Sequence, residues 1–405
     1  MNSRLPIYFI VLTVIIDSMG IGLILPVMPA LIQDVSGGDL SGAALWGGVL
    51  ATAFAVMQFL FGPTLGNLSD RFGRRLVLLT SLFFMVLDYL LMAFAWTIWL
   101  LLIGRLIGGI TAATHSTANA YMADISKPED KAANFGLIGA GFGIGFVFGP
   151  VLGGLLAEYG ARAPFYAAAL LAAANFVFGW AVLPETVTDA IRRPFRWKRA
   201  NPLGAFYHIG SLPGLRKMMI VVFVYGIAFF VYPAIWAYFG IERFGWSEQM
   251  IGLSLGLFGI CTAIVQAVLI RPIIARLGER KTVFLGLGID IVAFVFLAFV
   301  TNGWLALAFT PITAFGSVAG PALQGLMSRI APDDQQGELQ GTISSINAVA
   351  MIVAPLLMTQ IFWFFARPES SLYLPGAPFL LSALLVLIAI AILASERTKP
   401  AVSSA

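Results

Sequence analysis

The chain has 405 residues, of which 59% are hydrophobic and only 11% are charged, with a formal net charge of +4. Soluble globular proteins carry about 25% charged residues, so this chain has too few charges to cover a water-facing surface. The composition therefore excludes a soluble enzyme, a nucleic-acid-binding protein and a disordered protein. One cysteine, Cys261, and two distant histidines, His115 and His208, also exclude a disulfide framework and a zinc site.

Twelve mainly apolar runs follow one another along the chain, each close to the roughly 20 residues that a membrane helix needs. In chain order, we predict membrane helices over 7–31, 43–65, 76–96, 98–121, 132–157, 164–183, 217–239, 250–270, 282–301, 303–326, 338–365 and 373–394. No small-residue cleavage site follows the first run, so we expect it to be a retained span. The expected fold class is an all-α membrane protein.

The twelve predicted helices fall into two groups of six, separated by the longest and most charged link. We predict an N-terminal six-helix bundle over 1–183, a linker over 184–216 and a C-terminal six-helix bundle over 217–405. Three matching pairs lie 205 or 204 residues apart: Gly73 and Gly278, Pro150 and Pro355, and Pro128 and Pro332. Parallel six-helix repeats with a site between them are a transporter architecture. The alternative is two similar packing halves without transport.

The cationic residues of the links predict the orientation. Twenty of the 24 lie on the side that holds both termini and the linker, and only Arg162, Arg243 and Arg367 lie on the other. Because short cytoplasmic loops carry the excess of Lys and Arg, both termini are predicted to be cytoplasmic. The basic run over 192–199 is predicted to lie on anionic lipid, with a regulatory docking site as the alternative.

Four ionisable residues lie well inside predicted spans: Asp17, Asp88, Arg105 and Asp290. Each costs about 2.5–3.5 kcal/mol at a helix centre, so we expect them to face a wet cavity, a partner or a substrate. Together they leave two uncompensated negative charges, which protons or a cationic substrate can neutralise. A carboxylate that binds one or the other couples their opposite movements. The alternative is an aspartate–arginine pair that only locks two helices, and the sequence leaves open which acid carries the proton.

Two further motifs indicate moving parts. The link after the second predicted helix contains glycines, an acid and arginines: Gly66, Asp70, Arg71, Gly73, Arg74 and Arg75. The glycines permit a tight turn, and we expect the acid to bond helix N-terminal amides or an arginine, with Asp124 as a partner. Such a cluster could clamp the cytoplasmic side shut in one state.

The predicted helix over 132–157 is rich in glycine and kinked by proline, with Gly145, Gly149 and Pro150 at its centre. Small residues let membrane helices approach closely. We expect these glycines to let the helix slide against a helix of the other half. Static close packing is the alternative.

These motifs resemble those of a known family. Gly66-x-x-x-Asp70-Arg71-x-Gly73-Arg74-Arg75 is similar to the loop 2–3 signature of the Major Facilitator Superfamily, and Gly104-Arg105 with Gly108-Gly109 is similar to its helix 4 arginine motif. Gly145-x-x-x-Gly149-Pro150 resembles the helix 5 motif of its proton antiporters. The stretch from Asp17 to Pro26, the Leu87-Asp88 pair and the segment after Asp290 resemble the tetracycline–proton antiporters.

The resemblance implies a twelve-helix fold in a bacterial inner membrane and export of a tetracycline, as a complex with a divalent cation such as Mg²⁺, in exchange for a proton. It implies no permanently bound cofactor, no nucleic-acid partner and a functional monomer in the lipid bilayer. The residues that it implicates in transport are Asp17, Asp88, Arg105 and Asp290, with Gln58 and Gln266 facing the substrate and Asp70 and Asp124 in the cytoplasmic gate.

One position departs from the family pattern. Better-known members have a histidine four residues before the glutamine that matches Gln266, and this chain has Thr262. Threonine cannot titrate, so proton coupling through that position is absent. His115 is either a substitute or a packing histidine. The alternative functions are export of another amphipathic drug or metabolite and a non-transporting receptor; no metalloprotease motif supports an enzyme.

Overall fold

The computed structural model describes most of the chain. The described residues are 5–127, 130–189, 192–202, 204, 214–332 and 335–396, and the side chains of 132, 198 and 199 are left out. Pro128, His208 and three of the counted terminal cations, Arg4, Arg397 and Lys399, lie outside them, as does part of the linker. Within the described residues, twelve helical segments are long and apolar enough to cross a membrane, which confirms the predicted number of spans.

The first six spans, here called the N half, use eight α-helices. Their bounds are α1 (Leu5–Ile24), α2 (Met28–Ser36), α3 (Leu40–Phe72), α4 (Arg74–Phe94), α5 (Ile98–Thr111), α6 (Thr114–Ile125), α7 (Lys131–Leu156) and α8 (Ala163–Val182). The first span ends at Ile24, before the predicted end at 31, because Pro26 lacks the amide that would continue the helix. The short α2 then starts a separate helix.

The last six spans, here called the C half, are more interrupted. Their bounds are α9 (Arg216–Phe229), α10 (Val231–Phe244), α11 (Glu248–Ile264), the π-helix η4 (Val265–Leu269), α12 (Ile270–Leu277), α13 (Glu279–Phe299), α14 (Gly303–Phe315), the 3₁₀ turn η5 (Gly316–Val318), α15 (Ala319–Ile330), α16 (Gln336–Ala366) and α17 (Ala377–Ala394). The break between α5 and α6 and the η5 turn between α14 and α15 lie about 205 residues apart, which is the offset of the sequence repeat.

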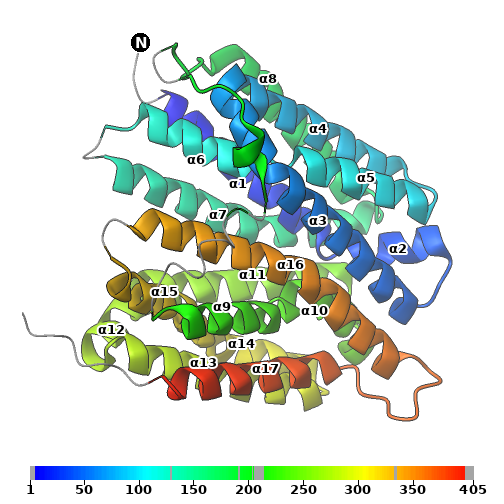
Figure 1. Cartoon of the computed structure of the whole chain (residues 1–405). Coiled ribbons are helices and arrows are strands. Elements are labelled where there is room, and N and C mark those ends of the chain that lie inside the picture. The colour runs from blue at the N-terminus through cyan, green and yellow to red at the C-terminus, as the bar shows by residue number, and fades with distance from the viewer. Residues whose placement is uncertain are drawn as a thin grey trace, which may run out of the picture.

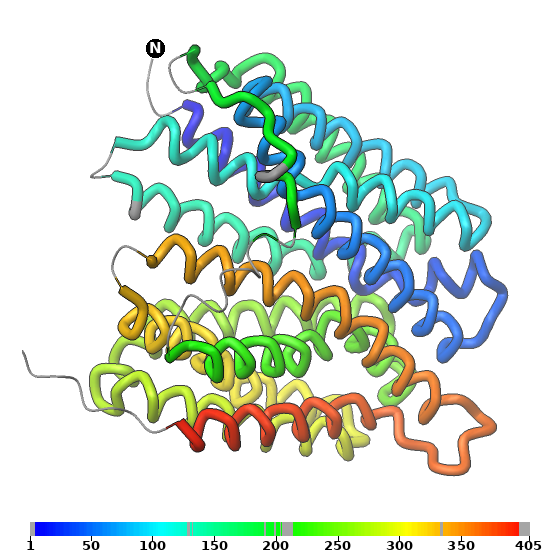
Figure 2. The backbone as a smooth tube through the Cα atoms, viewed as in Figure 1, coloured from blue at the N-terminus to red at the C-terminus, as the bar shows by residue number. Residues whose placement is uncertain are grey.

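The two halves lie side by side, with the N half from blue to green and the C half from green to red (Figure 1). The start of α1, the end of α17 and the linker lie at one end of the bundle (Figure 2), which we call the linker end. The opposite end, with the turns near 25–39 and 367–376, is called the far end. The boundaries of the two predicted domains at 183 and 217 remain a prediction.

The halves meet along two helix pairs, α3 with α16 and α7 with α11. The closest contacts lie toward the far end: the Thr52 hydroxyl donates to the Ile352 carbonyl at 3.1 Å, and a side chain at Gly154 would meet the Glu248 carbonyl at 2.6 Å. Toward the linker end, a side chain added at Gly139 of α7 or Gly341 of α16 would meet no atom within 4 Å. The interface is therefore closed at the far end and opens toward the linker end.

Candidate functional site

An ion pair between Asp88 of α4 and Arg105 of α5 lies inside the N half. The carboxylate is buried against the α5 backbone, where a side chain at Gly108 would come within 2.9 Å of Asp88 Oδ2. Gly104 and Gly108 are spaced one turn apart, so together they leave the room that the carboxylate occupies. The Arg105 guanidinium also lies 5.2 Å from the Phe54 ring centre of α3. The pair thus links three helices and cancels its own charge.

Asp17 lies in the middle of α1, half-buried, and among the described residues it has no recorded hydrogen bond or ion pair. It lies near the Asp88–Arg105 pair, because Tyr89 directly follows Asp88 and its hydroxyl reaches α1. That hydroxyl contacts Gly20, one turn after Asp17. Since Arg105 already neutralises Asp88, Asp17 leaves these three residues with one negative charge in excess.

Asp290 of α13 is the acid of the C half, and it is completely buried. The Tyr225 hydroxyl of α9 donates to Asp290 Oδ2 at 3.1 Å. Oδ1 has no hydrogen-bond partner among the described residues and lies against Gly316 of η5. No ion pair to Asp290 is recorded in the described part of the chain. The C half therefore buries a carboxyl group without a fixed countercharge.

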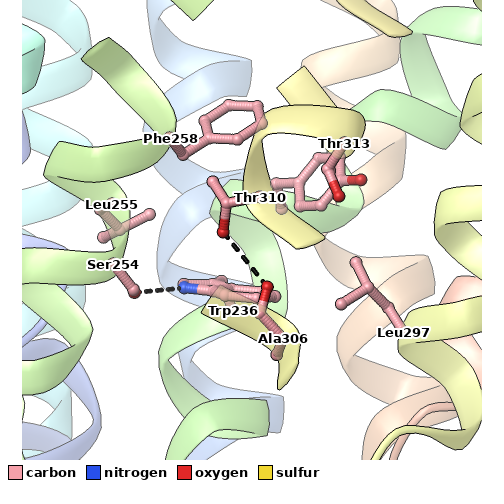
Figure 3. A pocket seen from close by; sticks show the side chains of 9 residues that line it. Trp236, Ser254, Leu255, Phe258, Leu297, Ala306, Thr310 and Thr313 are labelled. Carbon is pink, nitrogen blue, oxygen red and sulfur yellow. Dashed lines mark hydrogen bonds between the residues drawn. The ribbon is translucent and has the colours of Figure 1, made fainter. Parts of the chain in front are cut away.

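A small cavity lies within the C half, toward the far end, between α10, α11, α13 and α14 (Figure 3). Its lining includes Tyr232, Trp236, Ser254, Phe258, Thr310 and Thr313. Trp236 Nε1 donates to Ser254 Oγ at 2.9 Å, and Thr310 Oγ1 donates to the Ala306 carbonyl at 3.2 Å. Its volume of about 20 Å³ suits a single water molecule. Drug-sized ligands need pockets of roughly 300–1,000 Å³, so this cavity is not a drug site in this conformation.

The polar residues expected to face substrate lie on α3 and on the eighth span. Gln58 is half-buried, and Gln266 is exposed in the π-helical turn η4. Thr262, one turn earlier, is half-buried, and its hydroxyl has no partner among the described residues. Single π turns are frequent at functional sites because the extra residue redirects side chains. The sequence carries no signal for this turn.

His115 lies apart from these acids in its contacts. It is exposed on α6, and its ring packs against the Phe142 ring of α7 with centroids 5.9 Å apart. No hydrogen bond of its ring is recorded in the described part of the chain. A proton-carrying role for His115 stays untested.

At the linker end, Arg74 joins the loop 2–3 motif to the end of the fourth span. Its guanidinium pairs with Asp70 at 2.6 Å and with Asp124 at 3.2 Å, and Asp124 also accepts from the Thr186 hydroxyl at 3.0 Å. Gly73 has a φ of 113°, a left-handed conformation that favours glycine. Arg71, in contrast, contacts only the adjacent Phe72 ring, at 5.0 Å, among the described residues.

Glu185, at the start of the linker, caps this turn and was missed by the sequence analysis. Its carboxylate accepts from the Arg74 amide at 2.9 Å and the Arg75 amide at 3.2 Å, which are the first amides of α4. The Arg75 side chain donates to the Trp180 carbonyl at 2.7 Å. The helix N-terminal amides are therefore bonded by Glu185, whereas Asp70 bonds an arginine, which was the other partner expected for it.

The linker also docks on the N half. The Asn67 side chain donates to the Arg196 carbonyl at 2.7 Å, and the Arg193 amide donates to the Asp70 carbonyl at 3.2 Å. The turn η2 (Trp197–Ala200) packs against α3, and the linker crosses the linker end of the N half (Figure 1). All recorded partners of the loop 2–3 cluster lie in the N half or the linker, so in this conformation it does not clamp the two halves together.

The C half builds a matching ion pair with opposite signs. Glu279 and Arg329 lie 2.9 Å apart and are 205 residues after Arg74 and Asp124 respectively. The basic residue of one pair thus matches the acidic residue of the other. The Arg329 side chain is 74% exposed, whereas that of Arg74 is only 15% exposed.

The expectation for the glycines of α7 was wrong in part. A side chain at Gly145 would come within 2.9 Å of the Met19 amide, and one at Gly149 within 2.9 Å of Gly22, both on α1 of the same half. Residues four apart share one helix face, so these glycines turn together toward α1. The other face meets α11, where Gly154 and Pro150 contact the backbone around Glu248 and Gly252.

Comparison with known proteins agrees with this architecture. The family description "Major Facilitator Superfamily" matches residues 10–241 and 218–405. The tetracycline resistance protein class C of Escherichia coli is 42% identical over 89% of this chain and 91% of its own length. The class G protein of Vibrio anguillarum is 39% identical over 86% of this chain and 88% of its own.

Among solved structures, the human organic anion transporter MFSD10 (TETRAN) superposes with a TM-score of 0.71, covering 97% of this chain and 100% of that one at 24% identity. At that identity, the likeness shows the fold alone. The family and the fold are those of transporters rather than enzymes. The chain therefore belongs to the Major Facilitator Superfamily, and within it to the family of the tetracycline resistance proteins.

Proposed function

We propose that this chain exports tetracycline-type drugs across a bacterial inner membrane in exchange for protons. The observation that carries the proposal is the charge arrangement in the spans. Arg105 cancels Asp88, whereas Asp17 and Asp290 have no recorded basic partner among the described residues. A half-buried acid and a fully buried acid without fixed countercharges need protons or a cationic passenger, which is the requirement for antiport. Six relatives named as tetracycline resistance proteins support tetracycline as the passenger.

The conformation supports alternating access. The excess of cationic residues predicted for the side that holds the linker supports a cytoplasmic location for the linker end and both termini. The interface between the halves is closed at the far end, so the chain is open to the cytoplasm, where an exporter loads its drug. Closing the linker end would bring the Arg74 cluster toward α16, which is the gating role that we assign to it. The chain acts as a monomer in this scheme.

Mg²⁺ enters the scheme as part of the substrate and not as a resident ion. Among the described residues, no group of three metal-ligating side chains is positioned to hold a metal ion. A tetracycline–Mg²⁺ complex brings its own cation. The half-buried Asp17 is the acid that we expect to contact this cation when the drug enters from the linker end. Gln58 and Gln266 would then contact the drug. Omitting Mg²⁺ from a transport assay should therefore reduce uptake.

Thr262 favours one alternative, export of a different amphipathic compound. Its buried hydroxyl has no partner among the described residues and lies one turn before Gln266 of the π turn, so it can bond a neutral polar group once a rearrangement of this span exposes it. The test is drug-susceptibility profiling of an efflux-deficient bacterium that expresses the chain, with unrelated drugs beside tetracycline. Resistance confined to tetracyclines supports the proposal. Resistance to other drugs without tetracycline resistance overturns it in favour of the alternative.

A further inference from the structure

The cavity of the C half takes the place that an arginine occupies in the N half. Thr310 is 205 residues after Arg105, and Thr313 is 205 residues after Gly108, so α14 repeats α5 at these positions. In the N half, the guanidinium of Arg105 reaches the buried acid Asp88. In the C half, the short Thr310 side chain bonds its own helix at the Ala306 carbonyl and leaves the space open.

Tyr232 connects this cavity to Asp290. Its ring lines the cavity, and its buried hydroxyl has no hydrogen-bond partner among the described residues. The Tyr232 ring packs against the Phe294 ring of α13, with centroids 5.6 Å apart, and Phe294 lies one turn after Asp290. Asp290 Oδ1 also lacks a partner, while Tyr225 holds Oδ2. A phenol both accepts and donates a proton, so Tyr232 has the chemistry of a relay.

No charged side chain is recorded beside Asp290 in the described part of the chain. The titratable side chains near it are Tyr225 from α9, which bonds it, and Tyr232 from α10, whose ring packs against Phe294 one turn further along α13. From α12, α14, α15, α17 and η5, which also pack against α13, the structure records no charged partner for it, although α12 carries Arg271 and Arg276. The positive charge that neutralises Asp290 therefore has to arrive as a mobile ion.

We propose that the cavity is the inner end of a far-side proton path and that Tyr232 passes protons from it to Asp290. The inference rests on the proposed function, which it deepens. When the far end opens, a hydronium in the cavity gives a proton to the Tyr232 oxygen while the Tyr232 hydroxyl proton passes to the Asp290 carboxylate. One O–H bond breaks and one forms at each transfer, and a water molecule remains. In the present conformation the cavity is closed to the size of one water.

The test compares Tyr232→Phe with the wild type in proteoliposomes. Two rates are measured: tetracycline uptake driven by a pH gradient, and tetracycline counterflow without a gradient, which needs no proton loading. We expect gradient-driven uptake to fall about 100-fold, the typical contribution of a positioned proton donor, while counterflow stays within about twofold. Tyr166→Phe, on the exposed face of α8, is the matched control and should change neither rate.

A second variant reaches the same cavity from another helix, in case Tyr232→Phe fails to fold. Thr310→Leu adds bulk to the cavity wall and should also slow gradient-driven uptake selectively. Ala308→Leu adds bulk on the exposed side of the same helix and serves as its control. Coupled uptake at wild-type rates in either cavity variant would overturn the inference alone. A wild type that shows no tetracycline counterflow would overturn the proposed function, and the inference with it.

Discussion

Each half buries an acid in its third span, but the two halves neutralise it in different ways. In the N half, Asp88 meets the guanidinium of Arg105, which cannot release its proton. In the C half, the position that matches Arg105 is Thr310, and Asp290 receives only a hydrogen bond from the Tyr225 hydroxyl. Asp88 lies against Gly108 and Asp290 lies against Gly316. In both halves a glycine therefore makes room for the carboxylate, but only the N half supplies a basic partner for it.

This difference suggests that one repeat stabilises the helix packing, whereas the other couples transport to proton exchange. A permanently paired acid has the same net charge in every step, so it holds helices together without responding to pH. An acid bonded only by a phenol is stable in the membrane when protonated and costly when ionised. We therefore propose that the pair in the N half belongs to the fixed framework, that Asp290 carries the exchangeable proton and that Asp17 faces the passenger.

The largest expected effect comes from neutralising the unpaired acids. Asp290→Asn keeps the size and the bond to Tyr225 but cannot carry a proton, so pH-gradient-driven uptake should fall by at least about 100-fold. Asp17→Asn should abolish gradient-driven efflux as well, because it removes the charge that meets the passenger. Uptake into everted vesicles and membrane insertion by fractionation check both. Full drug resistance in both variants would break the assignment.

The next effect is on folding and concerns the fixed pair. Arg105→Ala leaves the Asp88 carboxylate buried without its partner, and breaking one side of a buried pair costs about 3–5 kcal/mol. We expect a lower yield of folded protein and an earlier thermal unfolding transition. Adding Asp88→Asn removes the stranded charge and should restore much of the stability. A double variant as unstable as Arg105→Ala alone would show that the guanidinium acts through its contact with Phe54.

The membrane spans and the ionisable residues within them could be predicted from the sequence, because the cost of polar groups in lipid leaves clear patterns in it. Twenty-residue apolar runs, loop cations and acids stranded in apolar spans are each forced by the cost of polar groups in lipid, so the twelve spans and the four ionisable residues could be read directly. The pairing of Asp88 with Arg105 was weighed as a possibility. The sequence could not show which of Asp17, Asp88 and Asp290 carries the exchangeable proton, because the answer depends on which acid pairs with Arg105 in the folded chain.

Other parts of the site could not be predicted, because they depend on tertiary contacts between residues that lie far apart in the sequence. Tyr225 and Tyr232 look like ordinary aromatic residues of an apolar span. Only packing shows that the Tyr225 hydroxyl bonds Asp290 and that the Tyr232 ring lies on Phe294, one turn after Asp290. Glu185 is distant in sequence from the α4 amides that it caps. The glycines of α7 were correctly associated with close packing but assigned to the wrong neighbour, since a spacing of four defines a face without saying which helix it meets.

A smaller effect is expected from the two linker-end ion pairs. Arg74 is mostly buried and bonds two acids, so Arg74→Ala should destabilise the N half by about 1.5–3 kcal/mol. Arg329 is 74% exposed, so Arg329→Ala should cost at most about 1 kcal/mol. Thermal unfolding of the two variants measures these losses of stability.

Asp70→Asn should slow transport without removing tetracycline binding. Equilibrium binding and vesicle uptake check this prediction, and an unchanged uptake rate in Asp70→Asn would rule out a gating role.

The smallest effect sharpens the comparison at the far end, where two matching long helices begin with different caps. Asp39 caps α3 by accepting from the Gly42 amide at 3.0 Å, and Ser247 caps α11 by accepting from the Met250 amide at 3.3 Å. The Ser41 hydroxyl, with the nearby amides, lowers the pKa of Asp39, although partial burial opposes this. Replacing either cap by alanine should cost about 1 kcal/mol at neutral pH.

The pH dependence then separates the two caps. A carboxyl group whose folded pKa is depressed stabilises fully above its unfolded pKa, about 3.9, and this stability is lost as the pH falls through the folded pKa. The deficit of Asp39→Ala relative to wild type should therefore be present at pH 7 and shrink below about pH 4. The deficit of Ser247→Ala should stay constant, because serine carries no charge. Thermal unfolding of both variants across this range decides the matter, since an Asp39→Ala deficit unchanged at acid pH would mean that the cap does not need its charge.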